Sequence, residues 1–130
     1  MHIGLIGLGR MGGNMARRLA RGGIQVTGYS LGAAERAALE GEPNIAVAAQ
    51  LEALLEALPS PRIVWLMVPA GEATEQNVAA LGARLGAGDL VIDGGNAFYR
   101  DSQRRGALLA AQDIGFLDAA KSGQITFAVF

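Results

Sequence analysis

The sequence predicts an α/β protein, a single domain over residues 1–130 in which a doubly wound, mostly parallel sheet lies between two layers of helices. Three observations lead to this prediction. Short apolar runs rich in β-branched residues alternate with segments of helical periodicity. The runs are apolar on both faces, as parallel strands covered by helices must be. Glycines follow most of the helical segments, where a left-handed cap is common. The repeated strand–helix order implies right-handed crossovers and therefore a doubly wound sheet.

The individual strands and helices are predicted from the same apolar runs and helical periodicity. Strands are expected at residues 3–6, 24–29, 45–48, 63–68, 90–93 and 116–118. The helix after the first strand buries one stripe, formed by Gly12, Met15, Ala16 and Leu19. Later helices bury stripes at three- and four-residue spacing: Leu51, Leu54, Leu55 and Leu58, and then Val78, Leu81 and Leu85. The last residues, 124–130, form either an edge strand or an apolar tail that pairs with another copy, which would give a homo-oligomer.

Composition narrows the classes of partner and compartment. Of the 130 residues 51% are hydrophobic, enough for a core, and the formal net charge is -1. The chain lacks the basic footprint of a nucleic-acid binder, so no nucleic-acid partner is expected. It has no cysteine, which excludes disulfides and thiolate metal sites. Its apolar runs are shorter than the roughly 20 residues of a membrane span, and no leader precedes the first strand. We therefore expect a cytoplasmic protein with no membrane partner.

A glycine pattern lies between the first strand and the first helix. Residues 7–12, GLGRMG, spell G-x-G-x-x-G, which in this position predicts a dinucleotide-binding loop. Gly7 would allow the tight turn out of the strand, Gly9 would let a diphosphate approach the backbone, and Gly12 would let the helix lie close to the strand. The helix N-terminus would then bind the diphosphate through its N–H groups. The alternative is a packing turn without a ligand, and Arg10 either contacts the cofactor or lies in solvent.

Four segments together resemble the cofactor domain of decarboxylating 6-phosphogluconate dehydrogenases, within the β-hydroxyacid dehydrogenase superfamily. They are GLGRMGGNMARRL, VWLMVPAGEATE, DLVIDGGNAFYRDSQRR and FLDAAKSG, and the first is most similar to the bacterial short form. The resemblance implies a Rossmann fold and NADP or NAD as the cofactor. It also implies the oxidative decarboxylation of 6-phosphogluconate, or of a related hydroxy acid. With 6-phosphogluconate the product is ribulose 5-phosphate, in the pentose phosphate pathway.

The resemblance assigns roles to individual residues. The loop that would hold the diphosphate consists of Gly7, Leu8, Gly9, Arg10, Met11 and Gly12. The nicotinamide side would be lined by Val68, Pro69 and Ala70. Asn96 would contact both the nicotinamide ribose and the substrate, and Ser122 and Gly123 would bind the substrate. Without the resemblance, Asn96 is explained equally well as a turn residue after two glycines.

Three acidic residues receive structural explanations. Asp93 and Asp118 stand at strand ends, where we expect them to accept hydrogen bonds from nearby turns rather than to act as acids. Asp101 precedes SQRR and is expected to cap the N-terminus of a helix.

Two segments depart from the family pattern. At the end of the second strand, an acid typically binds the NAD ribose, or polar and basic groups bind the NADP phosphate. Here Ser30 and the two residues after it match neither choice, and Arg36 is the cation nearest in sequence. Ser30 is still expected to contact the cofactor, while the preference between NAD and NADP stays open. In the second segment, Lys121 precedes the substrate-loop serine and Gln124 replaces a glycine, which would narrow the substrate pocket.

Catalysis is not expected from these 130 residues alone, and no catalytic residue is assigned to them. Oxidation of a secondary alcohol needs a base, and the decarboxylation that follows needs an acid. The resemblance places both on an all-helical second domain that these residues do not include. Lys121 and His2 are the sole lysine and histidine, and neither is at the family's position for the base. The alternatives are a regulatory module that senses NAD(P), another β-hydroxyacid dehydrogenase-like enzyme, or a different Rossmann enzyme such as a methyltransferase.

Overall fold

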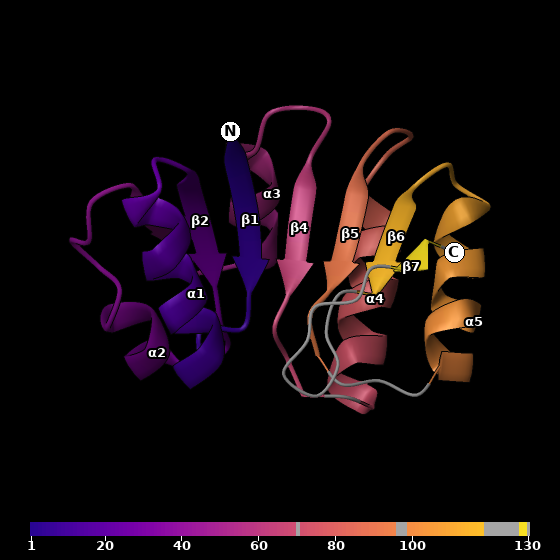
Figure 1. Cartoon of the computed structure of the whole chain (residues 1–130), viewed down its shortest axis with the longest axis horizontal. Helices are drawn as coiled ribbons and strands as arrows, with labels where there is room; N and C mark the ends of the chain where they lie inside the picture. The colour runs from indigo at the N-terminus through magenta and orange to yellow at the C-terminus, as the bar shows by residue number, and fades with distance from the viewer. Residues whose placement is uncertain (70, 96–98, 119–127, 130) are drawn as a thin grey trace.

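The computed structural model describes residues 1–69, 71–95, 99–118 and 128–129. Within them, one seven-stranded sheet has the strand order β3-β2-β1-β4-β5-β6-β7 (Figure 1). Its strands are β1 (His2–Ile6), β2 (Gln25–Tyr29), β3 (Ile45–Ala48), β4 (Ile63–Leu66), β5 (Leu90–Asp93), β6 (Gly115–Asp118) and β7 (Ala128–Val129). The helices are α1 (Arg10–Arg21), α2 (Ala33–Ala37), α3 (Leu51–Ala57), α4 (Glu72–Arg84) and α5 (Tyr99–Ala110).

The sheet is parallel from β3 across to β6, which confirms the predicted fold class. β1 lies in the middle, paired with β2 on one side and with β4 on the other. The chain first runs outward from β1 to β3 and then returns to β4, so strand order reverses between β1 and β4. Ligands of open α/β sheets bind beyond the carboxyl ends of the strands at such a reversal. In Figure 1 the arrowheads of the labelled parallel strands point to the edge where this site is expected.

The two faces of the sheet bury separate apolar clusters. On one face, side chains of α1 and of the turn after α2, including Ala16 and Leu39, pack against Leu5 and Val26 of the sheet. On the other face, α3, α4 and α5 bury Leu54, Leu81 and Leu109 among others against the strands. The chain therefore crosses the sheet once, between β3 and β4, and α1 begins at the reversal point. No helix among the described residues is both long and apolar enough to cross a bilayer.

Several boundaries differ from the sequence predictions for local reasons. β4 ends at Leu66 rather than at residue 68, because Pro69 has no N–H to donate and Gly71, with φ of 94°, turns the chain into α4. α5 begins at Tyr99, so Asp101 lies inside the first turn instead of capping it, and its carboxylate is 3.5 Å from the Arg104 guanidinium. In the predicted α1 stripe, Gly12 and Ala16 are buried, whereas Met15 and Leu19 are half-buried.

The C-terminal segment shows the first of its two predicted alternatives over its described residues. β7 pairs antiparallel with β6, with Val129 opposite Leu117 and Ala128 opposite Asp118. The rest of residues 124–130 lies outside the described residues. The described part of the tail is thus an edge strand of the same sheet.

Candidate cofactor-binding site

The turn out of β1 requires glycine at Gly7. Its φ is +97°, in the left-handed region that residues with a Cβ rarely adopt. Its N–H donates a hydrogen bond to the Tyr29 carbonyl oxygen at 2.8 Å, which ties the turn to the end of β2. A Cβ on Gly7 would lie 2.4 Å from the carbonyl oxygen of Met67, in the loop after β4. The predicted role of Gly7 in a tight turn is therefore confirmed.

Gly12 and Gly9 differ in the space around them. A Cβ on Gly12 would lie 1.8 Å from the carbonyl oxygen of Gly7, so α1 lies against the turn as predicted. Gly9 has extended backbone, with φ of −65° and ψ of −165°, which any residue can adopt. Among the described residues, a Cβ on Gly9 would meet only the Glu35 carboxylate, at 3.4 Å. Thus two glycines of the motif are required by the fold, whereas the fold leaves the Cβ position of Gly9 free.

The N-terminus of α1 is suited to an anion. Within the described part of the chain, its N-cap residue Gly9 makes no side-chain capping bond, and the first turn holds no acidic residue. The first N–H groups of a helix have no partner inside the helix, and the helix dipole places partial positive charge there. Arg10 and Met11 are exposed beside this turn, and Leu8 is buried. A diphosphate at Gly9 would therefore meet N–H donors without a competing carboxylate in that turn.

The end of β2 holds a chain of hydrogen bonds that the sequence did not reveal. The buried Ser30 hydroxyl accepts the Leu8 N–H at 3.3 Å and donates to Oε1 of Glu35 at 2.6 Å. Arg36 instead turns back on the main chain, donating from Nη1 to the carbonyl oxygens of Ser30 and Leu31 at 2.7 and 3.0 Å. The carboxylate of Glu35, a residue of α2, therefore lies at the end of β2. The sequence signal was an acid five residues after Ser30, beyond the position where it is usually sought.

A pocket of about 420 Å³ opens between α1 and α2 beside this chain of hydrogen bonds. Its lining comes from the glycine loop, the first turns of α1, and α2 with the residues that follow it: Leu8, Gly9, Arg10, Gly13, Asn14, Arg17, Ala34, Glu35, Ala38 and Leu39. The glycine loop and α2 thus border one concave surface. Such a volume matches the pockets that proteins use for small ligands.

The loops after β4 and β5 meet on the other side of the glycine loop. Thr74 is buried and donates from its hydroxyl to the Pro69 carbonyl oxygen at 2.9 Å, which fixes the loop at the start of α4. A Cβ on Gly95 would lie 2.9 Å from the Val68 carbonyl oxygen, so the two loops touch. Val68 is half-buried and Pro69 is exposed. Ala70, Asn96, Ser122 and Gly123, which were predicted to bind cofactor or substrate, lie outside the described residues.

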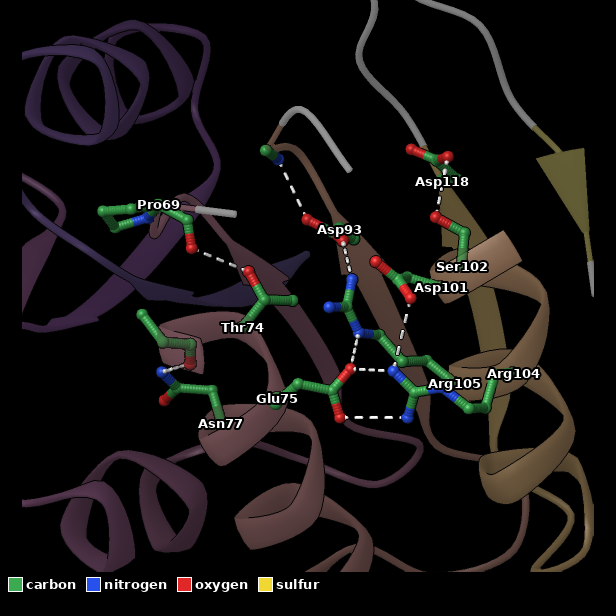
Figure 2. A network of polar contacts seen from close by, with 12 residues as sticks. Pro69, Thr74, Glu75, Asn77, Asp93, Asp101, Ser102, Arg104, Arg105 and Asp118 are labelled. Carbon is green, nitrogen blue, oxygen red and sulfur yellow. Dashed lines mark hydrogen bonds and ion pairs between the residues drawn. The ribbon is translucent and has the colours of Figure 1, made fainter. Parts of the chain in front are cut away.

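Figure 2 shows an ion-pair network among α4, α5 and the end of β5, in which Arg105 and Asp93 are buried and Arg104 is exposed. Arg105, 1% exposed, donates from Nε to Glu75 Oε1 at 2.7 Å, and its Nη1 lies 3.8 Å from Asp93 Oδ2. Arg104 also pairs with Glu75. Asp93 Oδ1 accepts the Gly95 N–H at 2.9 Å, as expected of a turn acceptor, while Asp118 accepts from the Ser102 hydroxyl on α5 rather than from a turn. The network ties α4 and α5 to the end of β5.

Sequence reasoning missed Glu75 and Arg105. The available signal was an arginine on the buried stripe of α5, one turn before Leu109, because a buried guanidinium requires an acidic partner.

The hydrogen bond from Arg104, together with the charge and hydrogen bond of Arg105, lowers the pKa of Glu75 to about 2. A carboxylate with a lowered pKa stabilises the fold above its unfolded pKa, near 4.5, and this stabilisation is lost as pH falls through about 2. Urea unfolding of the parent and of Glu75→Gln should therefore show a difference near neutral pH that shrinks over this interval. Because Glu75 is 36% exposed, solvent screening limits the pH-dependent part of the difference to about 1 kcal/mol.

Glu72→Gln is the matched control, since Glu72 lies in the same first turn of α4 and bonds Gln76 instead of an arginine. It should keep the pH dependence of the parent. A pH-independent difference between the parent and Glu75→Gln would contradict the assigned cause.

These features together define a class of protein. A glycine turn at the reversal of a parallel sheet, a helix N-terminus whose first turn holds no acid and a neighbouring pocket are the parts of a dinucleotide-binding domain of the Rossmann class. Residues 2–128 match the family described as the NAD binding domain of 6-phosphogluconate dehydrogenase. The chain belongs to this family.

The individual relatives agree with the family match. The chain is 42% identical over 125 residues to a decarboxylating 6-phosphogluconate dehydrogenase of Haemophilus ducreyi, covering 93% of this chain and 26% of that protein. It is 35% identical to an NAD(+)-dependent enzyme of Haloferax volcanii, covering 95% and 40%. The structure of Plasmodium falciparum 6-phosphogluconate dehydrogenase, solved apo, with NADP+ and with 6-phosphogluconate, aligns with a TM-score of 0.84 at 32% identity, covering 95% and 28%. The chain thus spans about a quarter to two fifths of the length of these relatives.

Proposed function

We propose that this chain is the cofactor domain of a decarboxylating 6-phosphogluconate dehydrogenase and binds NAD or NADP at the carboxyl edge of its sheet. The observation that carries this proposal is the difference among the motif glycines. The fold itself requires Gly7 and Gly12, whereas the space at Gly9 is left unfilled beside a helix N-terminus. A turn that served packing alone would not need that space, whereas a diphosphate that approaches the backbone would need it.

The rest of the cofactor would extend to both sides of the glycine loop. The adenosine half would lie toward Ser30 at the end of β2 and toward the pocket between α1 and α2. The nicotinamide half would lie over Val68, Pro69 and Ala70. There the bound cofactor would accept a hydride from the substrate. Asn96, Ser122 and Gly123 would orient the sugar acid, as the family resemblance implies.

We further propose that the base and the acid come from another part of the enzyme. His2 lies at the opposite end of β1 from the glycine loop, and its Nε2 is 2.7 Å from the Thr27 hydroxyl. Asp93 and Asp118 already accept hydrogen bonds within the fold. None of the described side chains therefore stands as a base over the nicotinamide side. General acid–base help contributes roughly 100-fold to 10,000-fold, so the chain by itself would bind without measurable turnover.

Calorimetric titration of the 130-residue chain with NAD, NADP and S-adenosylmethionine tests the proposal. A dinucleotide is expected to bind with a Kd on the order of tens of micromolar to millimolar, because one domain offers only part of an enzyme's contacts. S-adenosylmethionine should give no binding heat, and 6-phosphogluconate with either dinucleotide should give no reduced cofactor. Binding of S-adenosylmethionine alone would instead favour a methyltransferase-like protein. Turnover by the purified chain would place a base within these residues.

A further inference from the structure

The carboxylate of Glu35 is held beside the glycine loop by a hydrogen bond to one of its oxygens. Oε1 accepts the Ser30 hydroxyl at 2.6 Å, and the same hydroxyl accepts the N–H of Leu8 in the loop. Oε2 faces Gly9, since a Cβ built on Gly9 would lie 3.4 Å from it. Glu35 is nevertheless exposed and lines the pocket between α1 and α2. The carboxylate is thus positioned by the fold and accessible to a ligand.

Two of the three arginines near Glu35 bond to other groups of the protein. Arg36 bonds the main-chain carbonyl oxygens of Ser30 and Leu31. Arg17 lines the same pocket but pairs with Glu42 at 3.2 Å and donates to the Ala38 carbonyl oxygen at 3.3 Å. Arg10, exposed at the first residue of α1, is the exception, because it lines the pocket from the side of the helix N-terminus. Of the two charged side chains that bond to Ser30 at the end of β2, Glu35 lines the pocket and Arg36 does not.

We propose that Glu35 accepts a hydrogen bond from the 2′-hydroxyl of the adenosine ribose and thereby selects NAD against NADP. The inference rests on the proposed function, because a diphosphate at the N-terminus of α1 brings this ribose to the end of β2. An ionised carboxylate accepts hydrogen bonds from a hydroxyl and repels a 2′-phosphate. In dinucleotide-binding domains, the acidic residue that binds this hydroxyl usually stands at the end of the second strand itself. Here Ser30 holds an acid from α2 at the same place.

The selectivity can be measured by calorimetric titration of the same chain with NAD and with NADP. The parent should prefer NAD by about tenfold or more, since two like charges in contact are only partly screened at an exposed site. Glu35→Gln keeps the shape and removes the charge, so its preference for NAD should fall by about tenfold, mainly through tighter NADP binding. Glu35→Lys should reverse the preference. High salt should reduce the preference of the parent but not that of Glu35→Gln.

Glu56→Gln is the control for a change in net charge. Glu56 is exposed on α3, on the opposite face of the sheet, and its substitution should leave the parental preference unchanged. Far-ultraviolet circular dichroism of all variants checks that they fold. An equal preference in the parent and Glu35→Gln, or a parent that prefers NADP through Arg10, would overturn this inference and leave the proposed function intact. Failure of both dinucleotides to bind the folded parent would overturn the proposed function, and this inference with it.

Discussion

Gly12→Ala is expected to leave little folded protein, although it adds a single methyl group to a helix. The new Cβ would lie 1.8 Å from the carbonyl oxygen of Gly7 and 2.9 Å from its carbonyl carbon. Both atoms belong to the main chain of the turn, so no side-chain rotation relieves the overlap. Moving α1 away would open the contacts between Ala16 and the sheet. We expect a loss of about 4 kcal/mol, a large share of the roughly 5–15 kcal/mol that stabilises a domain.

Gly13→Ala, one residue further along α1, is the matched control. Its Cβ would lie 3.4 Å from the Leu8 carbonyl oxygen, at the edge of ordinary contact. Alanine is favoured over glycine inside a helix by roughly 0.5–1 kcal/mol, so this variant should be at least as stable as the parent. Urea unfolding followed by circular dichroism compares the two. Equal stabilities for Gly12→Ala and Gly13→Ala would show that the turn can yield and that close packing at Gly12 is not required.

Gly9→Val is expected to fold normally and to lose dinucleotide binding by at least about 100-fold. The extended backbone of Gly9 suits valine, and within the described part of the chain the space around its Cβ is limited only by the exposed carboxylate of Glu35. The same space is where the diphosphate would approach the N–H groups of α1. A branched side chain there keeps the phosphates out of hydrogen-bond reach, and several charge-assisted bonds are lost together. Calorimetric titration beside a thermal unfolding curve separates binding from stability.

Gly86→Val provides the control for introducing valine at a glycine. Gly86 is exposed in the turn between α4 and β5, at the opposite edge of the sheet, and a Cβ there would meet no atom of the described residues within 4 Å. This variant should bind the dinucleotide as the parent does. If Gly9→Val also retained binding, the loop would be a packing turn, and the alternative stated from the sequence would stand.

Hydrophobic periodicity determined the layered parallel fold, because each strand and helix shows its buried faces within a few residues of sequence. The glycine motif likewise revealed its own geometry, since the positive φ belongs to Gly7 itself and Gly12 approaches Gly7 within the same motif. These contacts are local. The order of strands and helices then left few ways to connect them.

Only the tertiary structure decided which charged groups stand at the site. Glu35 reaches Ser30 because the short helix α2 turns back toward the strand end, a direction that no pattern in the sequence specifies. Glu75 and Arg105 are thirty residues apart and meet because α4 and α5 pack on the same face of the sheet. Periodicity says which side of a helix is buried, but not which residue of another helix it will face. Packing therefore decides which charged residues pair with buried residues and with residues of the site. In this chain it also decides the proposed choice of cofactor, because that choice depends on the position of Glu35.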